Sequence, residues 1–131
     1  MSGSRVLSVG QCGFDGPQIE RLFQQEHAAR VESVDSGEEA AERLKDGQYD
    51  LVLVNRRLDS DGSSGIALLA QLHAQSPEVP VMLVSDRTDA QDEAVARGAL
   101  PGFGKSELRT PETAEKIRVA LGRGAAEDRL V

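Results

Sequence analysis

Five short apolar runs recur along the chain, and each is followed by a stretch with the spacing of an amphipathic helix. The runs comprise residues 5–9, 30–34, 50–55, 81–84 and 100–104. The third and fourth runs are almost continuously apolar, which is typical of strands buried on both faces of a parallel sheet. The last run contains Pro101 and two glycines, so we expect a short or distorted strand there.

Helix start signals follow the apolar runs. They are Asp15 before Pro17, Ser36 with Glu39, Ser63 and Ser64 before Gly65, Thr88 with Gln91, and Thr110 before Pro111. Strands that alternate with helices through short loops predict an α/β domain, a three-layer αβα sandwich around a five-stranded parallel sheet. We expect residues 1–124 to form this single domain and residues 125–131 to form a polar tail, since Gly122 and Gly124 end the last helix.

The composition excludes several classes of function. A net charge of −7 and an aromatic content of 3% argue against nucleic-acid binding, which relies on clustered cations and stacking rings. Cys12 is the only cysteine, so the chain has no disulfide framework and no Cys/His metal-ligand spacing. The first residues lack the cationic segment and long apolar run of a signal peptide or membrane span. We therefore expect a cytoplasmic protein without a membrane partner.

The central run, residues 50–55, ends in Asn55 and leads into a polar loop. In an open parallel sheet, ligands bind just beyond the carboxyl ends of the strands, so Asn55 faces the expected crevice. An aspartate there would be able to accept a phosphoryl group or bind a metal ion. A neutral amide is a poor nucleophile and offers no charge to a cation.

Over residues 5–121 the sequence resembles the receiver domains of bacterial two-component response regulators, which have the flavodoxin-like (βα)5 fold of CheY. The run at 50–54, with Leu58 and the later Asp61, is similar to the strand and loop around that family's phosphoacceptor aspartate. On this resemblance the phosphoacceptor position falls on Asn55.

Two further positions carry the resemblance. Ser85 closes the fourth strand, where the family has a serine or threonine, and Lys105 stands seven residues after Gly98, where the family has a lysine. Ala99 completes a Gly-Ala pair that the family also has before the fifth strand. Each match alone is weak, but their order along the chain makes the set fairly specific.

Several positions depart from the family pattern. The two adjacent acids that hold Mg²⁺ in the family correspond to Gly10 and Gln11 here, and with Asn55 all three carboxylates are absent. The resemblance therefore implies a pocket that binds Mg²⁺ poorly, and we expect no cofactor. The aromatic residue that moves on activation in the family corresponds to Gly102, which has no ring to move.

The polar residues of the crevice allow more than one interpretation. Asn55 is either a hydrogen-bonding hub for Lys105 and Ser85 or a strand end that matters for stability alone. Without a phosphoacceptor carboxylate, we expect Lys105 to turn toward solvent or toward a nearby acid.

Two arginines follow Asn55 directly. One of them takes the place of the missing cation, or Arg56 and Arg57 are a surface pair matched by Asp59, Asp61 or Asp86. The second interpretation carries little energy, because an exposed ion pair contributes about 0 to 1 kcal/mol.

These observations favour a stand-alone atypical receiver domain, a pseudo-receiver that acts in phosphorelay signalling through protein–protein interaction and is not an enzyme. Its partner would be a histidine kinase, another regulator or an output protein, and a homodimer stays open. Two alternatives remain. One is a receiver phosphorylated at Asp59 or Asp61. The other is a small flavodoxin-like nucleotide or flavin binder that uses the glycine-containing loop at residues 10–16.

Overall fold

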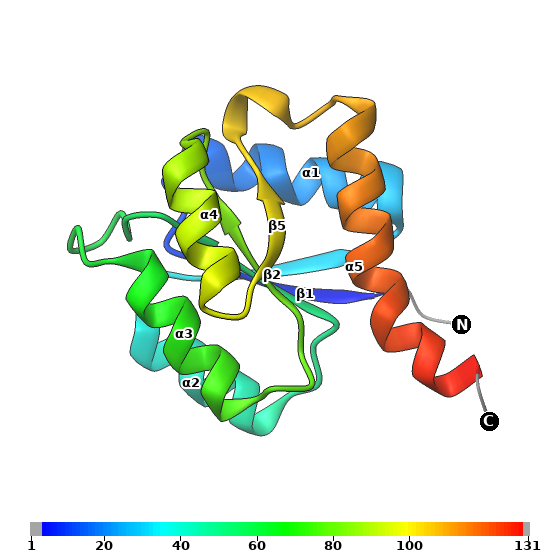
Figure 1. Cartoon of the computed structure of the whole chain (residues 1–131), viewed down its shortest axis with the longest axis horizontal. Coiled ribbons are helices and arrows are strands. Elements are labelled where there is room, and N and C mark those ends of the chain that lie inside the picture. Colours follow the sequence, from blue (N-terminus) through cyan, green and yellow to red (C-terminus); the bar gives the residue numbers. More distant parts are fainter. Residues whose placement is uncertain (1–3, 130–131) are drawn as a thin grey trace.

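The computed structural model describes residues 4–129, in which strands and helices alternate as predicted (Figure 1). The strands are β1 (Arg5–Val9), β2 (Arg30–Val34), β3 (Leu51–Asn55), β4 (Val81–Val84) and β5 (Leu100–Phe103). The helices are α1 (Asp15–His27), α2 (Gly37–Asp46), α3 (Gly65–Gln75), α4 (Thr88–Ala96) and α5 (Pro111–Arg129), with the short 3-10 helix η1 (Lys105–Glu107) before α5.

The strands form one parallel sheet in the order β2-β1-β3-β4-β5. Helices α1 and α5 cover one face of the sheet, and α2, α3 and α4 cover the other, which confirms the three-layer αβα sandwich (Figure 1). The strand order reverses between β1 and β3. The carboxyl ends of these two strands therefore flank the crevice at which doubly wound sheets bind ligands.

Two apolar clusters hold the layers together, one on each face of the sheet. Alternate residues of β3 enter different clusters, because successive side chains of a strand point to opposite faces. Val52 and Val54 pack under α2, α3 and α4, whereas Leu51 and Leu53 pack under α1 and α5. This double burial explains why the sequence of β3 is continuously apolar.

Three predicted helix caps are confirmed. The side-chain oxygens of Ser36, Ser64 and Thr110 each accept a hydrogen bond of 3.2 Å from a backbone N–H of the following first turn. These contacts satisfy N–H groups that have no partner within the helix. Local sequence therefore determines where α2, α3 and α5 begin.

Two other predicted caps are wrong. Asp15 lies inside the first turn of α1 and makes no capping hydrogen bond. Thr88 and Gln91 form no capping box, since α4 begins at Thr88 without a side-chain cap. In both cases the polar side chain contacts a distant part of the chain instead of its own helix. Asp15 binds Lys105, and Gln91 binds the backbone of β4 and β5.

The last helix is longer than predicted. α5 continues through Gly122 and Gly124 to Arg129, so the expected helix end is wrong. Glycine costs a helix only about 1 kcal/mol relative to alanine, and the alanines that follow favour continuation. Residues 130–131 of the predicted tail and residues 1–3 of the predicted domain lie outside the described part of the chain. None of the described helices is long and apolar enough to cross a membrane.

The pairing of β5 with β4 contains a register shift, as the glycines in the last apolar run suggested. The side chain of Gln91, from α4, spans this irregularity. Its Nε2 donates to the carbonyl oxygens of Leu83 (2.9 Å) and Ser85 (3.0 Å), and its Oε1 accepts from the N–H of Gly102 (3.0 Å). A Cβ atom at Gly102 would lie 2.0 Å from the carbonyl oxygen of Leu83, so this position accepts only glycine.

Phe103 is the main apolar contribution of β5. Its side chain is 1% exposed, and its ring lies 6.5 Å from that of Phe23 on α1, which confirms the predicted core role. We expect Phe103→Ala to lower the free energy of unfolding by about 3 to 5 kcal/mol, because it leaves a cavity between α1 and α5. Urea denaturation followed by circular dichroism measures this loss.

The control is Val119→Ala on the outer side of α5, where the side chain is 44% exposed. We expect it to change the same free energy by less than about 1 kcal/mol. Similar losses for the two variants would contradict the assignment of Phe103 to the core.

Candidate functional site

The carboxyl edge of the sheet brings together several residues singled out in the sequence. Gly10 and Gln11 follow β1, Asn55 ends β3, Ser85 follows β4, and Lys105 begins η1 after β5. Asn55 and Ser85 are buried, with 9% and 7% of their surface exposed. The parallel arrangement accounts for this gathering, because all strand ends meet at one edge.

Gly10 forms hydrogen bonds to three other segments at this edge of the sheet. Its N–H donates to the carbonyl of Val34 (2.9 Å), and its own carbonyl accepts from Nδ2 of Asn55 (3.2 Å) and from the N–H of Asp59 (3.0 Å). Its φ of +77° lies in the left-handed region that favours glycine. A Cβ atom here would also lie 2.3 Å from Cδ2 of Leu58. Both the backbone conformation and the packing therefore require glycine.

Of the two interpretations of Asn55, the hydrogen-bonding hub for Lys105 and Ser85 is wrong. Its amide donates to the carbonyl of Gly10, and no hydrogen bond joins it to Lys105 or Ser85 among the described residues. The hydroxyl of Ser85 instead accepts from the N–H of Arg87 (3.1 Å), in the turn that leads into α4. Asn55 thus links the ends of β1 and β3 and leaves β4 and β5 to other contacts.

Lys105 was expected to turn toward solvent or toward a nearby acid. It forms an ion pair with an acid from another element. Its Nζ lies 2.8 Å from Oδ2 of Asp15 in the first turn of α1. The thiol of Cys12 donates to the same oxygen (3.2 Å). The hydrogen bond from Lys105 holds the pKa of the Asp15 carboxyl below its usual value against the opposing effect of burial, and the Cys12 thiol adds to it. The pair connects α1 to the loop after β5.

Gln11 contributes a neutral amide to the same edge. Its Oε1 and Nε2 atoms are buried and make no hydrogen bond to the residues that the structure describes. An unpaired amide is costly to bury, but an unpaired carboxylate costs far more. The position therefore tolerates glutamine better than it would tolerate an isolated charge.

Arg56 and Arg57 lie on the other side of Asn55, toward α4. They line a groove of about 410 Å³ between the β3–α3 loop and the start of α4. Neither forms an ion pair with any residue from 4 to 122. Of the two interpretations of these arginines, the surface pair matched by Asp59, Asp61 or Asp86 is therefore wrong. Gly10 and Gln11 do not line this groove.

The three acids that we expected near the crevice do not contact Arg56 or Arg57, and each is bound or exposed elsewhere. Oδ1 of Asp86 accepts from the hydroxyl (2.6 Å) and the N–H (3.2 Å) of Ser106, which holds η1 against the end of β4. Asp59 and Asp61 are exposed on the β3–α3 loop. Hydrogen bonds from Ser63 lower the pKa of Asp61. Within the described residues, no group of three or more His, Cys, Asp or Glu side chains is placed to hold a metal ion.

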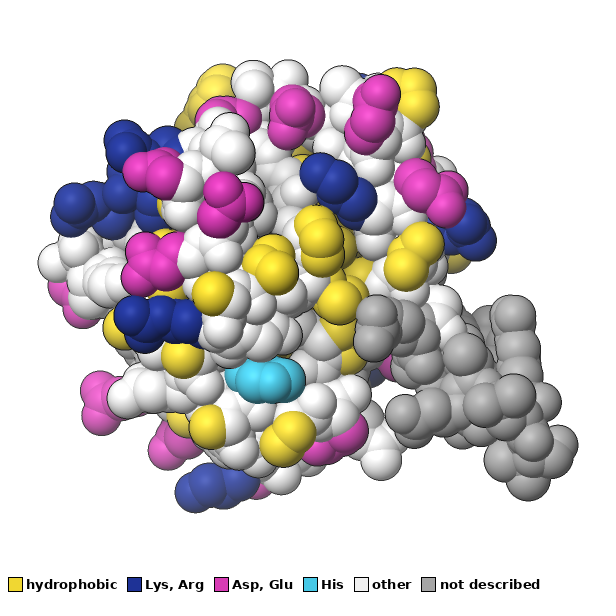
Figure 2. Space-filling model, viewed as in Figure 1, with side chains coloured by type: hydrophobic (Ala, Val, Ile, Leu, Met, Phe, Trp, Pro, Cys, Tyr) yellow, Lys and Arg dark blue, Asp and Glu magenta, His cyan; other side chains and the backbone are white. Residues whose placement is uncertain are grey.

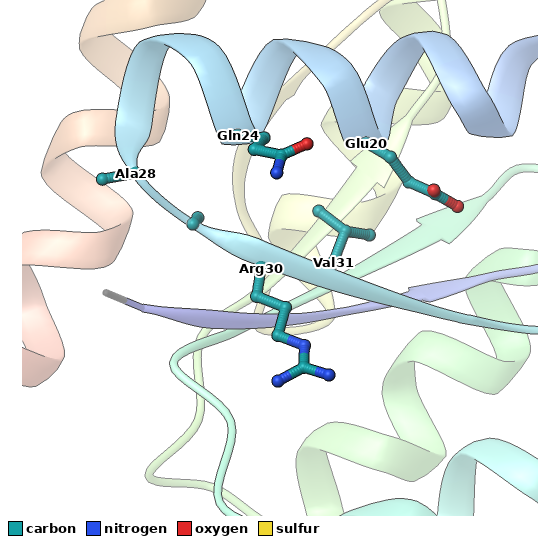
Figure 3. Close-up of a pocket in the computed structure, with 6 residues that line it drawn as sticks. Glu20, Gln24, Ala28, Arg30 and Val31 are labelled. Carbon is teal, nitrogen blue, oxygen red and sulfur yellow. The ribbon is translucent and has the colours of Figure 1, made fainter. Parts of the chain in front are cut away.

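A second hollow, of about 470 Å³, lies between α1 and the edge strand β2 (Figure 3). Glu20 and Gln24 reach it from the helix, whereas the guanidinium group of Arg30 points away from them. These polar groups do not converge on one point. We therefore place the candidate site at the carboxyl edge of the sheet.

The sequence matches the family model of the response regulator receiver domain over residues 17–102. The chain therefore belongs to the response regulator receiver domain family, as the resemblance implied. The matched range includes Asn55 and Ser85 and does not include Gly10, Gln11 or Lys105. No curated protein sequence matches the chain.

Solved structures share the fold. The signal receiver domain of an HD domain-containing protein from Pseudomonas fluorescens Pf-5 has a TM-score of 0.80 and 19% identity, over 100% of this chain and 96% of that one. A CheY-like receiver domain protein from Methanospirillum hungatei JF-1 has a TM-score of 0.75 and 19% identity, over 96% and 99%. NtrX from Brucella abortus has a TM-score of 0.76 and 20% identity over 97% of this chain, which spans only 29% of NtrX.

The pair of Asp15 and Lys105 predicts a pH-dependent contribution to stability. Because Lys105 lowers the folded-state pKa of Asp15, the pair stabilises the fold above the unfolded pKa of about 4, and this stabilisation is lost as the pH falls through the folded pKa. We expect Asp15→Asn to lower the free energy of unfolding by about 1 kcal/mol at pH 7 and by much less at pH 3. Urea denaturation at the two pH values measures both losses.

Asp92→Asn, on the exposed side of α4, removes the same charge and serves as the control. Its effect should be small at both pH values. Equal losses for Asp15→Asn at pH 7 and pH 3 would show that the ion pair does not contribute.

The close contact at Gly10 predicts that an acid cannot simply be restored there. We expect Gly10→Asp to lower the free energy of unfolding by about 2 to 4 kcal/mol, from left-handed strain and the clash with Leu58. Gly13→Asp is the matched control in the same loop, since a Cβ atom there meets nothing within 4 Å. Equally small losses for both variants, measured by urea denaturation, would refute this account of Gly10.

Proposed function

We propose that this chain is an atypical receiver domain that acts in two-component signalling by binding protein partners, without phosphorylation at the usual position. The observation that carries the proposal is the hydrogen bond from Asn55 to the carbonyl of Gly10. On the family resemblance, these two positions correspond to the phosphoacceptor and to a metal-binding acid. Here they bind each other directly.

The residues present do not fit Mg²⁺. The ion needs anionic oxygen to offset the cost of its dehydration, and Gly10, Gln11 and Asn55 offer none from their side chains. The amide NH₂ of Asn55 is a donor and is directed at the carbonyl of Gly10. Leu58 occupies the space that a side chain at position 10 would need. This donor set supports the proposal that the pocket holds no divalent ion.

Lys105 already has a negatively charged partner within the chain. In the proposed function, no phosphoryl group is therefore needed to bind its ammonium group. Its ammonium group is bound by Asp15, with 33% and 20% of the two side chains exposed. In the proposed function, this ion pair keeps the loop after β5 close to α1 at all times. No chemical modification is needed to hold that arrangement.

The α4–β5–α5 face, which those three elements form, is also held in place from inside. Gln91 binds α4 to β4 and β5, and Nζ of Lys116 on α5 donates to the carbonyl of Gly102 (3.0 Å). A groove of about 520 Å³ crosses this face, and apolar side chains lie between α4 and α5 (Figure 2). Such internal bonds support a binding surface with one fixed shape.

Exposed apolar side chains provide contacts for a protein partner on two surfaces. Phe14, at the start of α1, is 76% exposed, and Val95 on α4 is 44% exposed. Single exposed apolar side chains are common on protein surfaces, so these two residues are positions at which a partner contact is proposed and not a defined apolar patch. A histidine kinase, another regulator or an output protein is the class of partner we propose, and the stand-alone arrangement stays a prediction.

The alternatives receive less support from the site. The loop at residues 10–16 has two of its N–H groups, those of Gly10 and Gly16, already bonded to the carbonyls of Val34 and Cys12. These groups are therefore not free to cradle a phosphate of a nucleotide or flavin. Phosphorylation at Asp59 or Asp61 would occur on an exposed loop, and neither carboxylate forms an ion pair with a described lysine or arginine.

Incubation with acetyl phosphate and Mg²⁺, followed by intact mass spectrometry, tests the proposal. We expect no phosphoryl adduct on the wild type, because the acceptor is an amide and the ion has no anionic ligand. We expect the same for Asn55→Asp, because Gly10 and Gln11 still supply no carboxylate. A receiver domain with all three acids is the positive control.

Amide hydrogen exchange across residues 86–110, with and without the phosphodonor and Mg²⁺, tests the fixed surface separately. We expect identical exchange in the two conditions. Rapid Mg²⁺-dependent labelling of the wild type, or a donor-dependent change in this segment, would overturn the proposed function.

A further inference from the structure

The groove that Arg56 and Arg57 line is a local concentration of positive charge on an acidic chain. We name it the arginine groove, and its lining residues are Arg56, Arg57, Ser64, Ile66, Arg87, Asp89, Ala90 and Glu93. Lys and Arg side chains gather over this region, beside the start of α4 (Figure 2). The net charge of the whole chain is −7, so the three arginines stand out against their surroundings.

The backbone that carries two of these arginines is held in a defined turn. Arg57 pairs with Ser64 in an antiparallel bridge, and the N–H of Gly65 donates to the carbonyl of Arg56 (2.7 Å). The chain passes so closely here that a Cβ atom at Gly65 would lie 1.7 Å from the carbonyl oxygen of Asn55. The two arginine side chains therefore start from fixed positions.

Two of the three guanidinium groups have no ion-pair partner in the part of the chain that the structure describes. Arg87 forms a two-point pair with Asp89, with Nε and Nη2 at 3.2 Å and 2.9 Å from the carboxylate oxygens. Glu93, the other acid of the groove, pairs with Arg97 (3.3 Å). Arg56 and Arg57 have no carboxylate partner within the described residues. Their charges and donors are therefore available to a ligand.

We propose that the arginine groove binds a dianionic phosphate group, carried either by a free small molecule or by a phosphorylated side chain of a partner protein. The planar fork of a guanidinium group matches two oxygens of a phosphate, and several forks together favour a dianion over a single carboxylate. The start of α4 adds little to this attraction, because Asp89 in its first turn already accepts a hydrogen bond from the N–H of Ala90 (2.9 Å).

In the proposed complex, Arg87 binds the phosphate group in place of its present partner Asp89. Its side chain and that of Asp89 are 60% and 72% exposed, so water already weakens their pair. A bound phosphate would compete with Asp89 for this guanidinium group. The groove contains neither Asn55 nor Lys105, and the inference is therefore independent of whether the receiver crevice is phosphorylated.

An NMR titration with inorganic phosphate, against chloride at matched ionic strength, tests the inference. We expect saturable shifts of the Nε–Hε signals of Arg56, Arg57 and Arg87, with a Kd of about 1 mM. Arg57→Gln should weaken binding about tenfold, the usual contribution of one charge-assisted hydrogen bond. Asp89→Asn should strengthen binding, because it releases Arg87.

Arg118→Gln is the matched control, because it removes the same charge from an exposed position on α5, outside the groove. It should leave the affinity unchanged. Equal weakening by Arg57→Gln and Arg118→Gln would show non-specific attraction and overturn the inference. So would a titration without saturation, or a loss of binding on Lys105→Gln that Arg57→Gln does not cause.

A phosphoserine peptide and its unphosphorylated counterpart separate the two sources of the phosphate group. Binding of the phosphorylated peptide more than about tenfold tighter than inorganic phosphate assigns the groove to a modified protein partner. Equal affinities assign it to small phosphorylated molecules. Binding of both peptides with equal affinity would contradict recognition of phosphate.

Discussion

The carbonyl group of Gly10 is the contact on which the candidate site depends. It receives hydrogen bonds from the side chain of Asn55 and from the backbone of Asp59, while the N–H of the same residue binds Val34. Three segments are thereby held at one residue: the ends of β2 and β3 and the loop beyond β3. Leu58 packs so closely against Gly10 that no side chain fits there. The absence of an acid at this position therefore follows from the packing of the crevice as well as from the sequence.

Most of the fold was predictable because its signals are local. Continuous apolar runs marked the buried strands, and Ser36 and Ser64 marked helix starts that need only a neighbouring N–H group. The errors arose where a distant group competed for a side chain. Asp15 satisfies Lys105 rather than its own helix, and the helix end expected at Gly122 was overridden by the good helix formers beyond it.

The sequence predicted which residues lie at the candidate site much better than it predicted which partners their side chains bind. Strand ends of a parallel sheet must meet, so the gathering of Asn55 and Lys105 followed from the topology. Their partners depended on loop geometry that the sequence does not encode locally. Nothing in the pattern distinguished Arg57, which has no carboxylate partner among the described residues, from an ordinary surface arginine. Nor did it indicate that Asp15 lies within reach of Lys105.

The contact made by Gln91 has a consequence for how this domain opens. One amide group both donates to β4 and accepts from β5, replacing ladder bonds lost at the register shift. Glutamate would lack the donors, lysine would lack the acceptor, and asparagine would be one methylene group shorter. α4 therefore cannot detach without exposing the edge of the sheet. Local unfolding in this half of the molecule should involve the helix and both strands as one cooperative unit.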